Sequence, residues 1–141
     1  MNMMSRPWYN CLAWAFSRVL GKELPGTDVR KFTLNHKKTI DQAFIDKANE
    51  FDISVIKVDT FEQLKRYQYG FLVFGFYMEE VRSGFITDYV YKGFHVVLYQ
   101  DNTLFHQNGC GSFPISTSMK DLQNGGYTSP IYFAVVNKEQ D

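Results

Sequence analysis

Apolar residues recur at helical spacing in two segments near the start of the chain. The spacing predicts one helix over residues 10 to 20, opened by a polar N-cap such as Asn10 and ended by Gly21. It predicts a second amphipathic helix over residues 39 to 51. The apolar positions of the two helices are Leu12, Ala15, Phe16, Val19 and Leu20, then Ile40, Ala43, Phe44, Ala48 and Phe51. The segment between them shows no period, and we expect it to form a loop.

From residue 53 onward the pattern becomes that of strands separated by turns. Asp101 and Asn102 are a turn signal between two β-rich runs, which indicates a hairpin. Residues 79 to 88 are interpreted as a loop or an irregular connection. Strands are predicted over residues 53 to 58, 70 to 78, 91 to 100, 103 to 107 and 131 to 136, and short helices over residues 61 to 67, capped by Thr60, and 118 to 123.

The order of two helices followed by several mostly antiparallel strands predicts an α+β fold. The chain has 141 residues and a mass of 16.4 kDa, a common size for one domain, and we find no repeat or linker that would divide it. Aromatic residues make up 17% of the sequence, which is high and favours a core built on a β-sheet. We therefore expect a single domain over residues 1–141.

Charge and the N-terminal sequence limit the partners that we expect. Fifteen basic and fifteen acidic residues give a formal net charge of zero, so the chain lacks the field that attracts nucleic acid or an anionic membrane surface. The N-terminal residues do not resemble a secretory signal, and no apolar run is long enough to span a bilayer. We expect a cytoplasmic protein, or one delivered without a conventional signal peptide, that binds neither nucleic acid nor membrane.

Cys11 and Cys110 are the only cysteines of the chain. Two thiols are too few for a disulfide scaffold, and in a cytosolic protein we expect both to be reduced, with a Cys11–Cys110 disulfide as the alternative. A zinc site would need three ligands from Cys11, His36, His95, His106 and nearby carboxylates, without any closely spaced pair to begin it. We therefore expect no metal and no cofactor.

Cys11 lies where the first predicted helix begins. A thiol in the first turn faces the positive end of the helix dipole and unpaired N–H groups, which stabilise a thiolate. The same N–H groups can receive the oxyanion of a tetrahedral intermediate. Cys11 is thus a candidate nucleophile, and the alternative is a small hydrophobic residue buried under the helix.

His95 lies in a predicted strand whose residues alternate between two faces, so it shares a face with Val97 and not with Val96. If the hairpin turns at the Asp101–Asn102 signal, His106 lies opposite Val97 and is a diagonal neighbour of His95. A polar residue there can orient the imidazole of His95 and fix its tautomer. His106 and Asn108 share strand parity, so both are candidates for this role, whereas Gln107 would point away.

These residues resemble the papain-like cysteine peptidase superfamily, including the NlpC type of cell-wall endopeptidases and a group of bacterial and phage proteins that open with an Asn-Cys-x-x-aromatic-Ala motif. The matching stretches are NCLAWA at 10–15, FHVVLYQDN at 94–102 and LFHQNG at 104–109. The sequence departs from the pattern where His106 comes one residue early, Phe105 stands near the position of a Trp, and Gln107 replaces a Lys. Residues 22 to 90 match only in the order of their elements.

The resemblance implies a papain-like domain in which the N-terminal helix carrying the Cys packs on an antiparallel sheet. It implies Cys11 as nucleophile, His95 as base and His106 as the orienting residue, with Asn10 and Tyr9 near the oxyanion hole. The implied function is that of a thiol hydrolase or acyltransferase acting on an amide of a protein or peptide, including peptidoglycan. The alternative is an inactive papain-like scaffold that binds or inhibits a protein. The oligomeric state stays open.

Overall fold

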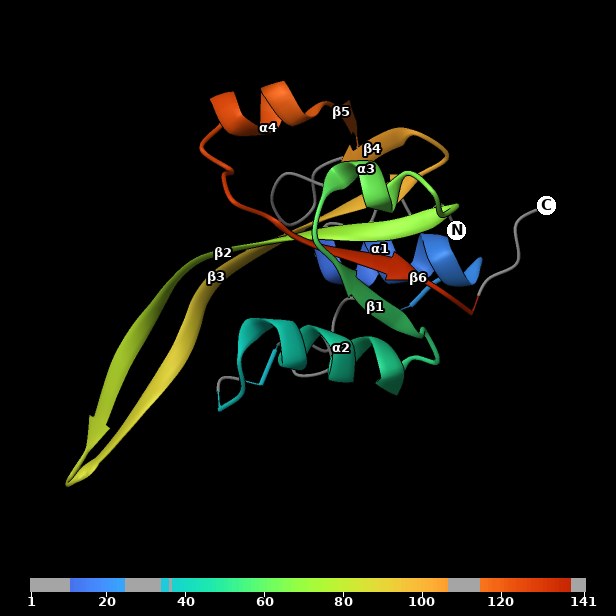
Figure 1. Cartoon of the computed structure of the whole chain (residues 1–141). Coiled ribbons are helices and arrows are strands. Elements are labelled where there is room, and N and C mark those ends of the chain that lie inside the picture. The colour runs from blue at the N-terminus through green and yellow to red at the C-terminus, as the bar shows by residue number, and fades with distance from the viewer. Residues whose placement is uncertain (1–10, 25–33, 36, 107–114, 138–141) are drawn as a thin grey trace.

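The computed structural model describes residues 11–24, 34–35, 37–106 and 115–137, with only the backbone described over residues 76–81 and 88–93. Four helices and six strands occur in these ranges: α1 (Cys11–Leu20), α2 (Ile40–Glu50), β1 (Val55–Val58), α3 (Phe61–Leu64), β2 (Tyr69–Ser83), β3 (Ile86–Gln100), β4 (Thr103–His106), β5 (Ile115–Thr117), α4 (Met119–Asn124) and β6 (Ile131–Val135). The fold is therefore mixed α+β, as the sequence predicts (Figure 1).

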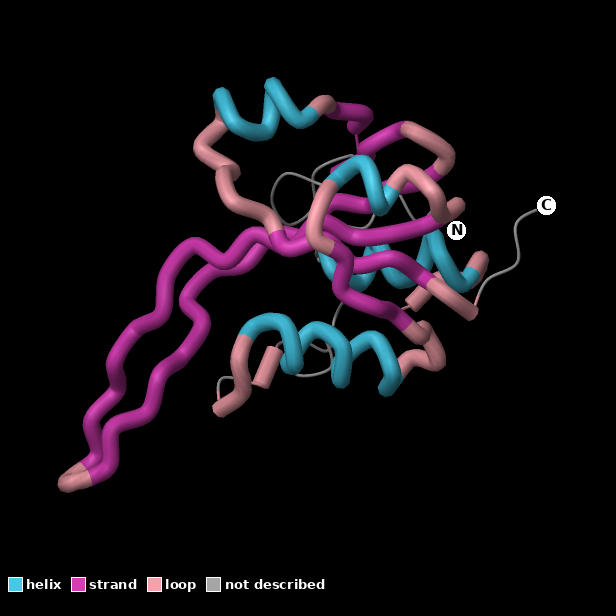
Figure 2. The backbone as a smooth tube through the Cα atoms, viewed as in Figure 1, coloured by secondary structure: helices cyan, strands magenta, loops and turns pink. Residues whose placement is uncertain are grey.

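The six strands form one antiparallel sheet in the order β1-β6-β2-β3-β4-β5. Strand β6 lies between β1 and β2, so the last strand of the described chain is inserted beside much earlier segments (Figure 2). The register between β3 and β4 pairs Leu98 with Phe105 and Gln100 with Thr103. This is the register expected from a turn at Asp101–Asn102, and both turn residues have positive φ, 47° and 65°.

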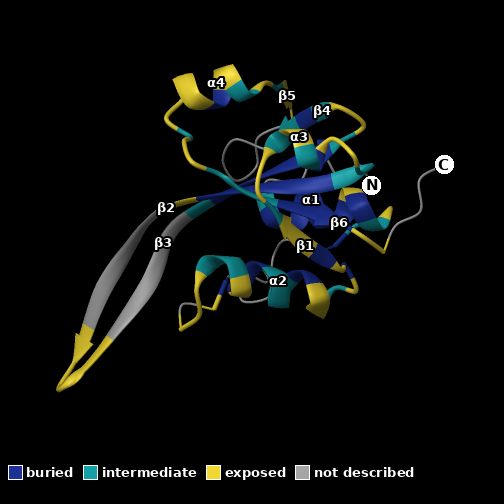
Figure 3. Ribbon diagram, in the orientation of Figure 1, coloured by how far each residue is buried: buried dark blue, intermediate teal, exposed yellow. Residues whose placement is uncertain are grey.

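Helices α1 and α2 cover one face of the sheet, which we call the first face. Helix α1 ends in a C-terminal cap in which the N–H groups of Gly21 and Lys22 donate to the carbonyl of Ser17, and Gly21 has φ 71°. Its apolar side chains are almost completely buried (Figure 3). The buried residues of this face are Leu12, Ala13, Trp14, Ala15, Phe16, Val19, Leu24, Leu34, Ala43, Phe44, Ala48, Ile53, Val55, Phe71, Val73, Val96, Leu98, Phe133 and Val135.

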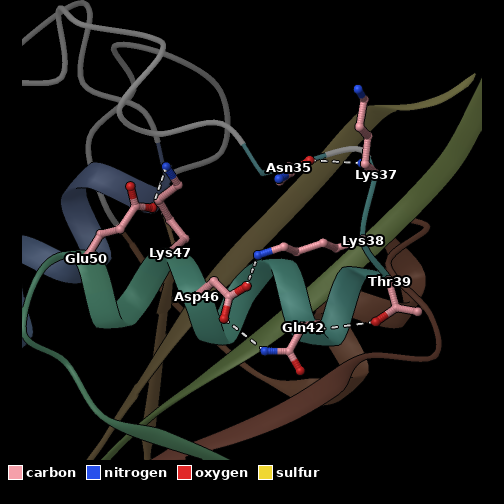
Figure 4. Close-up of polar contacts among 8 residues, drawn as sticks. All are labelled: Asn35, Lys37, Lys38, Thr39, Gln42, Asp46, Lys47 and Glu50. Carbon is pink, nitrogen blue, oxygen red and sulfur yellow. Dashed lines mark hydrogen bonds and ion pairs between the residues drawn. The ribbon is translucent and has the colours of Figure 1, made fainter.

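Helix α2 is capped by Thr39, whose side chain accepts a hydrogen bond from the N–H of Gln42 (Figure 4). On its exposed side, Asp46 forms an ion pair with Lys38 and accepts a hydrogen bond from the amide of Gln42. On its buried side, the Phe44 ring stacks on the Phe133 ring with 4.6 Å between centroids. The polar exposed side and the aromatic buried side together fix the orientation of α2 on the sheet.

Helices α3 and α4 lie on the opposite face, the second face. Thr60 and Ser118 cap them by accepting hydrogen bonds from the N–H groups of Gln63 and Asp121. The buried residues of the second face are Leu64, Leu72, Phe74, Val97, Tyr99, Leu104, Leu122 and Ala134. Strand residues thus alternate between two apolar layers, as expected for a central sheet that is covered on both sides.

Residues 79 to 88, interpreted from the sequence as a loop, instead continue β2 and β3, so that prediction was wrong. Their pairing runs from Met78↔Tyr91 to Ser83↔Ile86, and Gly84 makes the turn with φ 65°. We call residues 77–91 the arm, because they project away from the sheet as a two-stranded ribbon (Figures 1 and 2). The sequence analysis also did not predict the short strand β5.

None of the helices in the described ranges has the length and apolar character needed to cross a bilayer.

Candidate active site

The imidazoles of His95 on β3 and His106 at the end of β4 lie together. Nε2 of His95 is 2.9 Å from Nδ1 of His106, a hydrogen-bond distance. The antiparallel register of β3 and β4 makes the two residues diagonal neighbours on the second face. The neighbour relation expected between these histidines is confirmed.

Both imidazoles are buried, with exposed fractions of 5% for His95 and 6% for His106. Burial is the main cause that lowers the pKa of His95 to about 4, and the charge of a protonated His106 nearby is the second cause. Burial also lowers the pKa of His106. Both rings are therefore neutral at pH 7, and one ring donates its N–H to the other.

The tautomer decides which nitrogen of His95 can accept a proton. If Nε2 of His95 carries the hydrogen and donates to Nδ1 of His106, then Nδ1 of His95 has a lone pair and can act as a base. No described residue forms a hydrogen bond with Nδ1 of His95. The pair of histidines thus has the arrangement that a general base and its orienting residue require.

Aromatic rings surround His95 on the second face. The ring of Tyr127, in the connection between α4 and β6, stacks on the imidazole with 4.6 Å between centroids and 23° between planes. Its plane stands at 88° to the ring of His106, with centroids 6.4 Å apart. Phe74, the register partner of His95 on β2, lies at 6.5 Å. These rings exclude water, which explains the low pKa of His95.

Cys11 is the first residue of α1, as the resemblance implies, and is partly buried. It packs against the apolar cluster of the first face, and its helix contacts β3 from that side. His95 and His106 project to the second face, so the thiol and the imidazoles approach the same strand from opposite sides. The structure brings the two histidines together and leaves Cys11 with the first-face core.

Several residues named from the sequence cannot be placed. Asn10 and Tyr9, expected near an oxyanion hole, lie outside the described residues, as does Asn108, the other candidate for the third position. Cys110 also lies outside them, and Cys11 forms no disulfide with any described residue. Within the described ranges no three or more His, Cys, Asp or Glu side chains are grouped as metal ligands would be.

Tyr127 is the residue of this site that the sequence analysis missed. It is distant in sequence from both histidines, and no spacing rule links it to them. The local signal is the pair Gly125–Gly126 directly before it, because a glycine turn after a short helix sends the chain back toward the sheet. That signal predicts a turn, but it does not indicate that the side chain of Tyr127 contacts His95.

Comparisons with known proteins add no further constraint. No protein-family model matches the chain, and neither the search of curated proteins nor the search of solved structures found a match. The assignment of function therefore depends on the geometry of the histidine pair, the position of Cys11 and the resemblance of the motifs.

Proposed function

We propose that this chain is a papain-like thiol hydrolase or acyltransferase that acts on an amide bond of a protein or peptide. Cys11 is the nucleophile, His95 the base and His106 the orienting residue. The observation that carries the proposal is the hydrogen bond between Nε2 of His95 and Nδ1 of His106, because it can fix the tautomer in which Nδ1 of His95 accepts a proton.

The reaction needs the thiol of Cys11 within hydrogen-bond reach of Nδ1 of His95, so it requires the start of α1 to bring the thiol past β3 to the second face. The thiol proton moves to Nδ1, and the thiolate attacks the acyl carbon to form a tetrahedral intermediate. N–H groups at the start of α1 bind its oxyanion. The amine leaves with the proton from His95, and water or a second amine then attacks the thioester and releases Cys11.

The low pKa of His95 determines how the thiol is activated. An imidazole with a pKa of about 4 is neutral at pH 7 and ready to accept a proton. The same burial disfavours the imidazolium, so His95 holds the proton only while a negative charge develops on the thiolate or the oxyanion nearby. The dipole of α1 also stabilises the thiolate before substrate binds, in addition to the acceptance of the thiol proton by His95.

A measurement of Cys11 reactivity tests whether the imidazole of His95 activates the thiol of Cys11. In a Cys110→Ser background, Cys11 is the only cysteine, and its alkylation by iodoacetamide can be followed from pH 5 to pH 9. We expect a reactivity midpoint below the ordinary thiol value of about 8.5. We also expect His95→Gln to lower the rate at pH 7 about tenfold or more, because the base is lost.

His36→Gln is the matched control, because His36 is the one histidine of the chain besides His95 and His106. This variant should leave the alkylation profile unchanged. If His95→Gln and His36→Gln both give the profile of the parent protein, His95 does not act on Cys11 and the proposal fails. A second readout is the mass of one acyl group on Cys11 after exposure to p-nitrophenyl acetate, which Cys11→Ala should abolish.

The second candidate function is a papain-like scaffold that binds or inhibits a protein without turnover. The placement of Cys11 with the first-face core, on the opposite side of β3 from both imidazoles, favours it. In that case the alkylation midpoint of Cys11 stays near 8.5 and does not respond to His95→Gln. The same titration therefore separates the two functions.

A further inference from the structure

We propose that Tyr127 is a positioning residue for His95: its ring holds the imidazole in the orientation that keeps Nε2 on His106 and Nδ1 accessible as the base. The inference deepens the proposed function, because it depends on His95 being that base. Tyr127 itself is not assigned a contact with substrate.

The stacking geometry restricts the motion of the imidazole. With 4.6 Å between centroids and 23° between planes, the two rings lie nearly parallel, and rotation of His95 about its side-chain bonds would drive its edge into Tyr127. Phe74 contacts Tyr127 at 5.6 Å between centroids and supports it from β2. His95 is thus held on one side by stacking and at one ring nitrogen by His106.

The turn after α4 fixes the position of Tyr127. Its backbone N–H donates to the carbonyl of Leu122 at 2.9 Å, and Leu122 is buried in the second-face core. Gly126 between them has φ 93°, a conformation that side-chain-bearing residues rarely adopt. Because Leu122 anchors α4 in the second-face core, the turn after α4 holds the ring of Tyr127 against His95.

The groups that face His95 explain why a flat ring matters there. Among the residues that the structure describes, they are His106 from β4, Phe74 from β2 and Tyr127 from the connection between α4 and β6. None of these three is a carboxylate, so an imidazolium at position 95 would gain no counter-charge from them. The face of an aromatic ring attracts a cation weakly, but the same ring removes water from the imidazole, and burial is the main cause of the lowered pKa of His95.

Substitution of Tyr127 with Leu tests the inference. Leucine is apolar and large enough to fill much of the space, so the fold should persist. It has no flat ring to stack on His95, so the imidazole should rotate more freely and become more hydrated. We expect the NMR titration of His95 in the Tyr127→Leu variant to shift upward by one pH unit or more, toward the ordinary value. The Tyr127→Phe variant keeps the ring and should titrate like the wild type.

The control is Tyr67→Leu, because Tyr67 packs on the same second-face cluster without contacting either histidine. This variant should leave the His95 titration unchanged. If Tyr127→Leu titrates like the wild type, or if Tyr67→Leu shifts His95 equally, the ring of Tyr127 does not position the base. The titration does not use Cys11 and can be repeated in Cys11→Ala, so its outcome is independent of the alkylation result that tests the proposed function.

Discussion

At the scale of one residue, burial keeps the imidazole of His95 neutral, as a base must be. The same burial makes the folded protein less stable at low pH. The imidazole is 5% exposed and contacts two aromatic rings and a second histidine. The folded protein therefore resists protonation of His95, whereas the unfolded chain accepts a proton at the ordinary pKa. Acidification shifts the equilibrium toward the unfolded chain.

The predicted loss of stability follows from this difference in pKa. Between pH 6.5 and about 4 the unfolded state binds more protons than the folded state, so the free energy of unfolding falls as the pH falls. The full pKa difference corresponds to a loss on the order of 3 kcal/mol from His95 alone. Urea unfolding at pH 7.5 and pH 4.5 should show a smaller loss for His95→Gln than for the wild type.

This pH window separates the histidine effect from that of the carboxyl groups. Asp41 accepts a hydrogen bond from Lys57 at 2.8 Å, which lowers the pKa of Asp41 below 3.8. The stability that Asp41 contributes is present above 3.8 and is lost only as the pH falls below that value. Equal losses for His95→Gln and the wild type between pH 7.5 and pH 4.5 would contradict the prediction.

At the residue scale, the sequence predicted His106 as the neighbour of His95 within the sheet. It did not predict Tyr127, which covers His95 from outside the sheet. The turn signal at Asp101–Asn102 set the register, and the register placed His106 beside His95. Strand alternation showed that Val96 and His95 face opposite ways, but it does not say which face receives the first helix. That choice, which decides where Cys11 lies, is made by the packing of the whole helix.

At the scale of elements, β2 depends on a glycine close to its first residue. A Cβ at Gly70 would lie 2.7 Å from the carbonyl oxygen of Phe133 on the neighbouring strand β6 and 2.3 Å from Cδ1 of Leu64. Leu64 is fully buried at the end of α3. Neither neighbour can move away without disturbing the strand pairing or the second-face core.

Gly70→Ala should therefore destabilise the protein, by about 1–3 kcal/mol as is typical of overpacked cores. Gly125→Ala is a matched control, because φ at Gly125 is −83° and the nearest neighbour of a Cβ there, the carbonyl oxygen of Asp121, lies at 3.4 Å. Thermal unfolding of the two variants should show a clear drop in Tm for Gly70→Ala alone. Similar midpoints would mean that β2 and β6 adjust to a side chain at position 70.

The elements that the sequence predicted best are those with a chemical boundary. Thr60 caps α3 as expected, α2 begins close to the predicted residue with Thr39 as its cap, and Gly21 ends α1 in the left-handed conformation. The arm was missed because polar residues such as Glu79, Glu80 and Asp88 interrupt the apolar pattern that marks a buried strand. A strand that projects from the core buries no continuous face, so its sequence lacks the apolar pattern from which a strand is predicted.

At the scale of the whole molecule, the tip of the arm is apolar and exposed. Phe85 is fully exposed and Ile86 is 64% exposed. Phe44, by contrast, is 0% exposed at the centre of the first-face core and contacts the rings of Phe16, Phe71 and Phe133. The same residue type thus occupies two opposite environments in one chain.

These two phenylalanines predict a sharp contrast in stability. Phe44→Ala should cost about 3–5 kcal/mol, because it removes buried contacts and leaves a cavity. Phe85→Ala should change the free energy of unfolding by less than about 0.5 kcal/mol, because the ring is already in water. Urea unfolding of both variants measures the difference. A large effect of Phe85→Ala would show that the arm tip is packed against another part of the protein in solution.

The position of β6 between β1 and β2 has a consequence for synthesis of the chain. Val55 pairs with Val135, and the N–H of Val136 donates to the carbonyl of Ser54, so one edge of the sheet joins segments separated by most of the chain. On the ribosome, the β2–β3 hairpin can form early from local pairing, but β1 has no partner until β6 has emerged. Until then, the unpaired backbone N–H and C=O groups at the edges of β1 and β2 stay open to chaperones or to neighbouring nascent chains.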